Sequence, residues 1–256
     1  MSERARVPEV RVLASADAAV PVLLDEVRRT LSSSKQPLLG FATGNTFAAF
    51  LRALGAELQA GRVATTSFVA THLDEYLGFE PARRGGMVHE LCAACPPFDE
   101  MLSRGTFLPV PHDGEPASMQ AHGERLQRAG GVVLQFLGIG RNGHLAFNEP
   151  GTSFDRGFHG TTLAEATRDD ARARFAPNEP PRLAVTAGPA TILGARRLVL
   201  CAFGKSKALA VRSMLRGPVA PACPASVIRR HADVLVLLDA QAASGLDASA
   251  GGAAAD

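Results

Sequence analysis

The chain has 256 residues, of which 46% are hydrophobic and 20% are charged, and its 27 basic and 25 acidic side chains give a formal net charge of +2. This composition excludes a disordered chain and argues against nucleic-acid binding, which usually needs basic residues concentrated on one face. Every apolar stretch is far shorter than the ~20 residues of a membrane-spanning helix, and the charged N-terminus does not resemble a signal peptide. We therefore expect a cytoplasmic protein with no membrane and no nucleic-acid partner.

Short apolar runs alternate with amphipathic stretches along most of the chain, which is typical of a parallel sheet covered by helices. The predicted strands span residues 10–14, 38–42, 68–73, 106–110, 132–138, 198–203 and 234–238. The predicted helices span residues 17–31, 46–59, 117–129 and 206–215, and Ser15 is the expected N-cap of the first. We predict a doubly wound α/β fold with a mostly parallel sheet and helices on both faces.

Two segments depart from this alternation. Residues 151–181 are charged and arginine-rich and end in a proline-rich stretch, and we predict that they form a small lid. Residues 248–256 are small and polar, and we predict that this tail is disordered. The prediction is thus a single domain over residues 1–247, including the lid, followed by the tail.

The chain has four cysteines, and two of them, Cys92 and Cys95, have the spacing of zinc sites and redox pairs. His89 lies three residues before the first of them. A structural zinc ion needs four ligands, and the sequence offers no second pair of ligands nearby. We therefore favour ordinary buried or surface thiols over a metal or redox site.

Ligands of an open parallel sheet bind beyond the carboxyl ends of the strands, and polar clusters follow four of the predicted strands. The first cluster is Thr43, Gly44, Asn45 and Thr46, at the start of a predicted helix. The backbone N–H groups of such a turn, together with the helix dipole, suit a phosphate group. The alternative is that Thr43 or Thr46 merely caps the helix.

The second cluster, which is basic, also begins a predicted helix. Lys205 and Lys207 follow Gly204 directly after the strand predicted at residues 198–203. Cations at a helix N-terminus oppose the dipole, so their presence suggests an anion nearby, although both lysines could simply be solvated.

The two remaining clusters carry groups suited to acid–base chemistry. Asp74 and Glu75 follow a predicted strand, and a carboxyl group at the rim of a pocket can serve as a base, although a solvated acidic turn is the alternative. The glycine-rich loop of residues 138–150 carries His144 and Glu149. A histidine beside a carboxylate can transfer protons, whereas a dinucleotide site is excluded because no helical pattern follows the glycines.

Taken together with residues 183–188 and 224–226, these clusters resemble the glucosamine-6-phosphate deaminase/isomerase family over residues 38–239. The most specific match is the loop of residues 138–150, which ends in Phe147-Asn148-Glu149-Pro150. The related 6-phosphogluconolactonases share the glycine-rich loop and its histidine but lack this ending.

The resemblance implies conversion of an amino-sugar phosphate and water into fructose 6-phosphate and ammonia, without a cofactor or metal. Asp74 would move a proton from C2 to C1 of the open-chain sugar, with support from Glu75. His144 would open the sugar ring, oriented by Glu149 and Asn142. The implied phosphate ligands are Thr43, Gly44, Asn45, Thr46, Lys207 and a lid arginine, which is Arg174 or, as the alternative, Arg172.

Several positions differ from the family pattern. Asn142 stands where many members have aspartate, and its amide can hydrogen-bond the imidazole of His144 but cannot stabilise its charge. His72 and Phe47 replace the usual asparagine and proline. The alternatives are therefore a 6-phosphogluconolactonase, another sugar-phosphate isomerase, or a catalytically silent sugar-phosphate sensor. The preferred hexosamine phosphate, an allosteric effector and the oligomeric state, a homo-oligomer included, stay open.

Overall fold

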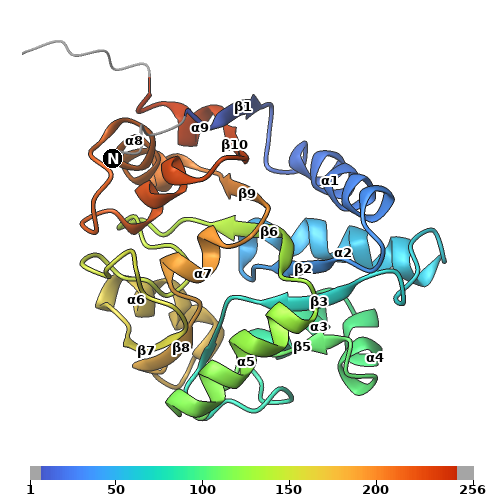
Figure 1. Cartoon of the computed structure of the whole chain (residues 1–256). Helices are drawn as coiled ribbons and strands as arrows, with labels where there is room; N and C mark the ends of the chain where they lie inside the picture. The colour runs from blue at the N-terminus through green and yellow to red at the C-terminus, as the bar shows by residue number, and fades with distance from the viewer. Residues whose placement is uncertain (1–6, 247–256) are drawn as a thin grey trace, which may run out of the picture.

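The computed structural model describes residues 7–246, and its centre is a seven-stranded sheet whose neighbouring strands all run parallel (Figure 1). From one edge to the other, the strands are β1 (Glu9–Leu13), β10 (Val234–Asp239), β9 (Arg197–Ala202), β6 (Val132–Gly138), β2 (Leu38–Phe41), β3 (Val69–His72) and β5 (Phe107–Leu108). Each predicted strand overlaps one of these seven. The predicted α/β fold with a mostly parallel sheet is therefore confirmed.

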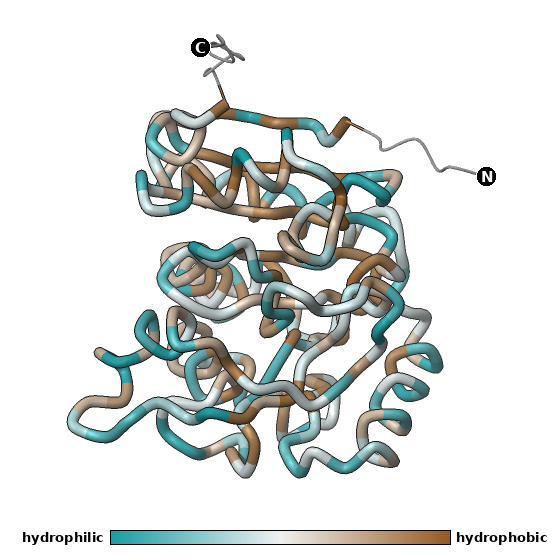
Figure 2. The backbone as a smooth tube through the Cα atoms, turned by 90° about the vertical axis from the view of Figure 1, so that its left-hand side faces the viewer, coloured by the Kyte–Doolittle hydropathy of each residue, from teal (hydrophilic) through white to brown (hydrophobic). Residues whose placement is uncertain are grey.

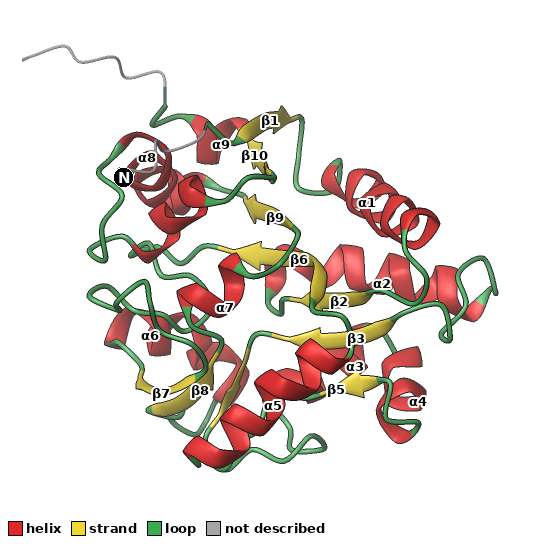
Figure 3. Ribbon diagram, in the orientation of Figure 1, coloured by secondary structure: helices red, strands yellow, loops and turns green. Residues whose placement is uncertain are grey.

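Helices cover both faces of this sheet. Leu38 of β2 packs with Leu126 of α5 (Pro116–Arg128), whereas Leu39 belongs to the large core that also contains α2 (Asn45–Gln59). Because successive side chains of a strand point to opposite faces, α5 and α2 lie on opposite sides of the sheet (Figure 3).

Four predicted helices match α1 (Ala19–Ser33), α2, α5 and α8 (Ala208–Arg216), the last preceded by the 3-10 helix η1 (Lys205–Lys207). Shorter helices were not predicted, since one or two turns leave too few residues for a periodic pattern. They are α3 (Met87–Ala94), α4 (Pro97–Ser103), α7 (Pro189–Leu193), α9 (Ala240–Ala243) and the 3-10 helix η2 (Pro224–Arg230). None of the helices within residues 7–246 has the length and apolar character that a membrane crossing needs.

Buried phenylalanines hold the central strands against the helices. Phe41 at the end of β2 lies 5.0 Å from Phe98 of α4, and Phe50 of α2 lies 4.9 Å from Phe136 of β6, as measured between ring centroids. Burying a side chain of this size contributes about 1.5–3 kcal/mol. The hydrophobic segments accordingly run through the interior in Figure 2. This packing fixes the positions of β2 and β6, whose carboxyl ends carry two of the polar clusters.

A second, antiparallel sheet consists of β4 (Asp74–Tyr76), β8 (Leu183–Thr186) and β7 (His159–Thr162). The sequence predicted a single strand over residues 68–73, followed by Asp74 and Glu75. That prediction is wrong at its end, because the chain leaves the first sheet after His72 and Asp74 begins a strand that pairs with β8. The three strands of the second sheet are short, and the sequence did not predict them.

Three other predictions concern the ends of elements and the segment of residues 151–181. Ser15 is not the N-cap of α1: its Oγ accepts a hydrogen bond from the N–H of Ala18 at 3.3 Å, one turn too early, and α1 begins at Ala19. The 151–181 segment contains β7 and the unpredicted helix α6 (Glu165–Phe175). The predicted tail, residues 248–256, lies outside the described residues.

Candidate active site

A cavity of about 510 Å³ opens at the carboxyl edge of the parallel sheet. The loops that follow β2, β3, β6 and β9 line it, and these four strands are neighbours in the centre of the sheet. Helix α6 and Tyr76 of β4 complete the wall. All four polar clusters predicted from the sequence contribute residues to this one cavity, which include Thr43, Gly44, Asn45, Thr46, Asp74, His144 and Lys207.

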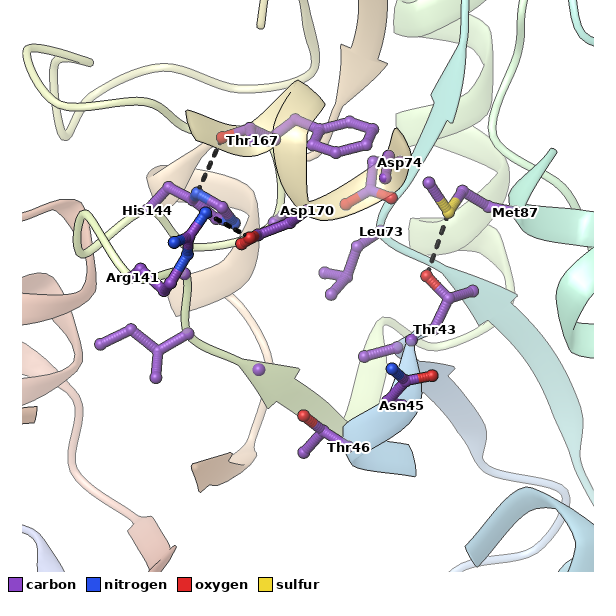
Figure 4. Close-up of a pocket in the computed structure, with 18 of the residues that line it drawn as sticks. Thr43, Asn45, Thr46, Leu73, Asp74, Met87, Arg141, His144, Thr167 and Asp170 are labelled. Carbon is purple, nitrogen blue, oxygen red and sulfur yellow. Dashed lines mark hydrogen bonds and ion pairs between the residues drawn. The ribbon is translucent and has the colours of Figure 1, made fainter. Parts of the chain in front are cut away.

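The loop after β2 forms one end of the cavity. Gly44 has a φ of 90°, which favours glycine, and it is the residue before the first turn of α2. Neither threonine caps this helix among the described residues: Thr43 Oγ1 donates to Met87 Sδ at 3.0 Å instead. The N-terminus of α2 therefore faces the cavity with its backbone N–H groups and positive dipole end, a suitable site for an anion (Figure 4).

Lys207 lines the same cavity from the loop after β9, whereas Lys205 is exposed and does not line it. Burial lowers the pKa of Lys207, and the nearby carboxylate of Asp170 partly offsets this effect. Of the two lysines in this cluster, Lys207 alone is thus placed to meet an anion in the cavity.

Asp74 lines the opposite part of the cavity. Its side chain is buried, and this burial, together with the negative charge of Glu75, raises its pKa to about 7, while the charge of Arg174 acts in the opposite direction. A carboxyl group with a pKa near neutrality can both accept and donate a proton.

Glu75, the next residue along β4, points away from the cavity. Its carboxylate accepts hydrogen bonds from the backbone N–H groups of Tyr76 (2.8 Å), Met87 (2.9 Å) and Val88 (3.1 Å), the last two in the first turn of α3. Burial raises the pKa of Glu75, and these three hydrogen bonds partly reverse the shift. Glu75 therefore anchors β4 to α3 and influences Asp74 through its charge.

His144 lies on the glycine-rich loop and contacts two side chains through Nδ1. Thr167 Oγ1 of α6 lies 3.1 Å from Nδ1, and Glu149 Oε2 lies 3.9 Å from it. The Thr167 hydroxyl donates its single proton to Glu149 Oε1 at 2.6 Å, so it can only accept from Nδ1–H of His144. The arrangement leaves Nε2 of the neutral ring without a proton, so this nitrogen can accept one.

The loop leaves no space beside the imidazole. A Cβ atom at Gly140 would lie 2.2 Å from the His144 ring, so a side chain at this position would displace the imidazole. Burial lowers the pKa of His144; the charges of Glu149 and Asp170 raise it, and the charge of Lys207 lowers it further.

Asn142 does not bond the imidazole, which corrects the expectation from the sequence. Its Nδ2 donates to Glu149 Oε2 at 2.9 Å, and its Oδ1 accepts from the backbone N–H of His144 at 3.1 Å. Glu149 Oε1 also accepts from the backbone N–H of Ala164 at 3.0 Å. Asn142 thus positions Glu149 and closes the loop, while Thr167 provides the contact with the imidazole.

The structure distinguishes the two candidate lid arginines. Arg174 lines the cavity, and its Nη2 donates to the hydroxyl of Tyr76 at 3.0 Å. Arg172 lies on the outer face of α6, where it pairs with Asp169 at 2.7 Å and Glu165 at 2.6 Å. Arg174 is therefore the arginine that can reach a ligand.

Arg141, Thr167 and Asp170 are among the polar groups of the cavity that sequence reasoning missed. Thr167 and Asp170 stand on one face of α6 with Arg174, at the helical spacing i, i+3, i+7. This spacing was the signal that could have found them, but residues 151–181 were not expected to contain a helix.

The two closely spaced cysteines are both buried, and burial raises the pKa of each thiol to about 12. Within residues 7–246, no group of three or more histidine, cysteine, aspartate or glutamate side chains is placed to hold a metal ion. His72, which also lines the cavity, accepts a hydrogen bond from the N–H of Val110 through Nε2 at 2.9 Å.

Together, the fold and the cavity define a class of α/β proteins with an acid–base site and an anion site at the carboxyl edge of a parallel sheet. The sequence profile of the family described as glucosamine-6-phosphate isomerases/6-phosphogluconolactonase matches residues 13–237, and the chain belongs to this family. The resemblance found in the sequence is thereby confirmed.

Individual relatives agree with this assignment. The glucosamine-6-phosphate deaminase of Colwellia psychrerythraea is 38% identical over 224 residues, which cover 86% of this chain and 84% of the relative. The solved structure of a monomeric glucosamine-6-phosphate deaminase has a TM-score of 0.81 and 31% identity, covering 93% of this chain and 99% of that one. The 6-phosphogluconolactonase of Leishmania guyanensis, at 17% identity and a TM-score of 0.73 over 94% of this chain and 100% of that one, shares the fold alone.

Proposed function

We propose that this protein is a glucosamine-6-phosphate deaminase, which converts glucosamine 6-phosphate and water into fructose 6-phosphate and ammonia. The observation that carries the proposal is the convergence of Asp74 and His144 on one cavity that is also lined by the N-terminus of α2 and by Lys207. The 38% identity to a glucosamine-6-phosphate deaminase supports the same activity.

His144 is suited to the first step, opening of the sugar ring. Its Nε2 can take the proton of the C1 hydroxyl and pass a proton to the ring oxygen, which leaves an open-chain aldehyde. The imidazole of His144 becomes positively charged when it takes the proton. Glu149 stabilises this charge directly, at 3.9 Å from Nδ1, and through the hydroxyl of Thr167.

Asp74 is suited to the second step, transfer of a proton between neighbouring carbons. Its carboxylate removes the proton from C2, next to the carbonyl group, and returns it to C1. The nitrogen at C2 then forms an imine, which water hydrolyses to the ketone and ammonia. A pKa of about 7 matches this cycle, because the group must be a base in one half and an acid in the other.

The phosphate group of the substrate fits the other end of the cavity. The N-terminus of α2 offers backbone N–H groups, and Lys207 and Arg174 offer positive charge. We assign the phosphate to residues Thr43, Gly44, Asn45, Thr46, Arg174 and Lys207. Because α6 supplies one wall of the cavity, we also assign the role of a lid to residues 151–181.

The four cysteines are all free thiols, which agrees with the reducing cytoplasm that we infer as the location of the protein.

The test is an assay of the purified protein with a panel of hexosamine 6-phosphates, in which released ammonia and fructose 6-phosphate are measured. We expect equal amounts of both products from glucosamine 6-phosphate. Hydrolysis of 6-phosphogluconolactone without ammonia release from any amino sugar would instead identify a lactonase. Binding of the sugars without turnover would identify a sensor.

A further inference from the structure

Asp170 belongs to the wall of the cavity although it stands on a half-exposed helix. The face of α6 that lines the cavity carries Thr167, Asp170, Ala171 and Arg174. Neighbouring Asp169 lies outside the cavity lining and pairs with Arg172. The two aspartates are thus adjacent in sequence, but only Asp170 can act on a ligand.

An ion pair holds the Asp170 carboxylate in this wall. Arg141 Nη2 lies 2.6 Å from Asp170 Oδ1, and the two side chains are 46% and 40% exposed. Arg141 stands on the same loop as His144, so the ion pair connects the loop to α6 beside the imidazole (Figure 4). Both side chains of this ion pair line the cavity, so the pair differs from an ordinary ion pair on the protein surface.

Asp170 offsets a concentration of positive charge. Among the described residues, the lysine and arginine side chains that line the cavity are Arg141, Arg174 and Lys207. The carboxylates that line it are Asp74 and Asp170. The charge of Arg141 lowers the pKa of Lys207, and the charge of Asp170 raises it, so the three groups are close enough to interact. Without Asp170, Arg141 and Lys207 would form a cationic surface next to the phosphate site.

We propose that Asp170 is a specificity residue, which lets the cavity accept a sugar with one phosphate group and disfavours a sugar that carries a second anionic group. The inference rests on the proposed function. A cavity of about 510 Å³ is roughly 10 Å across, so a second anion inside it lies within about one Debye length of Asp170. Such an anion meets an ion pair of Asp170 and Arg141 that has no net charge, whereas without Asp170 it would meet an unpaired Arg141 cation.

The number of anionic groups distinguishes ligands of the two activities in this family. The product of lactone hydrolysis by a 6-phosphogluconolactonase is a phosphosugar acid, whereas the proposed substrate and product of this chain carry the phosphate as their one anionic group. Asp170 thereby disfavours the acid product of a lactonase relative to the ligands of deamination.

Two ligands that differ at C1 alone test the proposal. Sorbitol 6-phosphate has a hydroxymethyl group there, and 6-phosphogluconate has a carboxylate. Binding of each ligand is measured by calorimetry, without turnover, for the wild type, Asp170→Asn, Arg141→Gln and the matched control Asp169→Asn. Because the phosphate is common to both ligands, its own repulsion by Asp170 cancels in the ratio of the two dissociation constants.

We expect the wild type to bind the acid more weakly than the alcohol. The ratio should fall roughly fivefold in Asp170→Asn at low salt, change less at high salt, and remain at the wild-type value in Asp169→Asn. Arg141→Gln should raise the ratio, because it leaves Asp170 unpaired. An unchanged ratio in both Asp170→Asn and Arg141→Gln would overturn the inference and leave the proposed function intact. Failure of the wild type to bind either ligand would overturn the phosphate site, and with it both proposals.

Discussion

Asp74 is ionisable and buried, and this combination affects stability as well as catalysis. Its pKa of about 7 in the folded protein lies above the ordinary value of 3.8. Between these two pH values the folded state binds more protons than the unfolded state, so this group makes the free energy of unfolding fall as the pH rises. The carboxylate that we propose as the base therefore destabilises the protein at neutral pH.

Replacement of Asp74 by asparagine removes this pH-dependent penalty. We expect the free energy of unfolding of Asp74→Asn, relative to that of the wild type, to be about 1–3 kcal/mol higher at pH 8 than at pH 5. Urea unfolding of both proteins at both pH values measures this difference. Asp113→Asn is the control: hydrogen bonds from Ser118 and the N–H of Glu115 lower the pKa of Asp113 from its ordinary value of 3.8, so this replacement should give a stability difference that stays constant between pH 5 and 8. A stability difference that does not depend on pH would contradict the assigned burial of Asp74.

Thr167 is the residue that determines which nitrogen of His144 carries the proton. Thr167→Val keeps the shape of the side chain but removes the hydroxyl between His144 and Glu149. We expect kcat to fall about tenfold to a hundredfold with a much smaller change in KM, because the tautomer of the catalytic base is no longer fixed. Thr162→Val, at an exposed position of β7, is the matched control and should keep wild-type kcat. Wild-type kcat in Thr167→Val would show that Glu149 alone orients the imidazole.

At the scale of elements, α6 contributes more to the site than any sequence pattern indicated. Its 11 residues contain few apolar side chains, so no amphipathic pattern predicts it. The helix instead directs Thr167, Asp170 and Arg174 toward the cavity, where each contacts a different partner. A helix whose inner face lines a ligand site cannot be found from hydrophobic periodicity, because the groups on that face are polar.

The strand β4 shows a second limit of sequence reasoning. The apolar run up to Leu73 predicts a strand, but nothing in it indicates that Asp74 begins a strand of another sheet. Pairing with β8, more than 100 residues away, fixes that change of direction. As a result, alternation along β4 sends Asp74 into the cavity and Glu75 to the N-terminus of α3.

Two of the three arginines of α6, Arg174 and Arg172, provide a test of its orientation. We expect Arg174→Ala to raise KM for the sugar phosphate at least about tenfold, since a charged hydrogen-bond donor to the phosphate is lost. Arg172→Ala removes an equal charge from the outer face and should leave KM unchanged. KM is measured by steady-state kinetics of both variants. A larger increase of KM in Arg172→Ala than in Arg174→Ala would contradict the assignment of Arg174 to the phosphate.

At the scale of the whole molecule, the parallel sheet brings distant residues together. The loops after β2, β3, β6 and β9 meet because these strands are neighbours and end at the same edge. The sequence could predict this convergence, because each loop follows an apolar strand and carries polar groups. The rule that ligands bind beyond the carboxyl ends of the strands in open α/β sheets is enough to predict that four residues are neighbours: Thr43, Asp74, His144 and Lys207.

The contacts within the cavity could not be predicted in the same way. The hydrogen bonds of Asn142 depend on the folded shape of the loop, which places its amide on Glu149 rather than on the imidazole. Likewise, the ion pair of Arg141 and Asp170 joins two segments whose approach depends on the position of α6. Sequence reasoning thus located the site, and tertiary packing determined the partners within it.

We propose that Asp74 carries the proton between the two carbons of the substrate, in a cavity that binds the sugar phosphate independently of this group. The most direct measurement compares the rate of ammonia release from glucosamine 6-phosphate by the wild type and Asp74→Asn, with binding of sorbitol 6-phosphate measured for both. We predict that the variant binds this ligand as the wild type does and loses at least about a thousandfold in kcat. Ammonia release at the wild-type rate by Asp74→Asn would contradict the account.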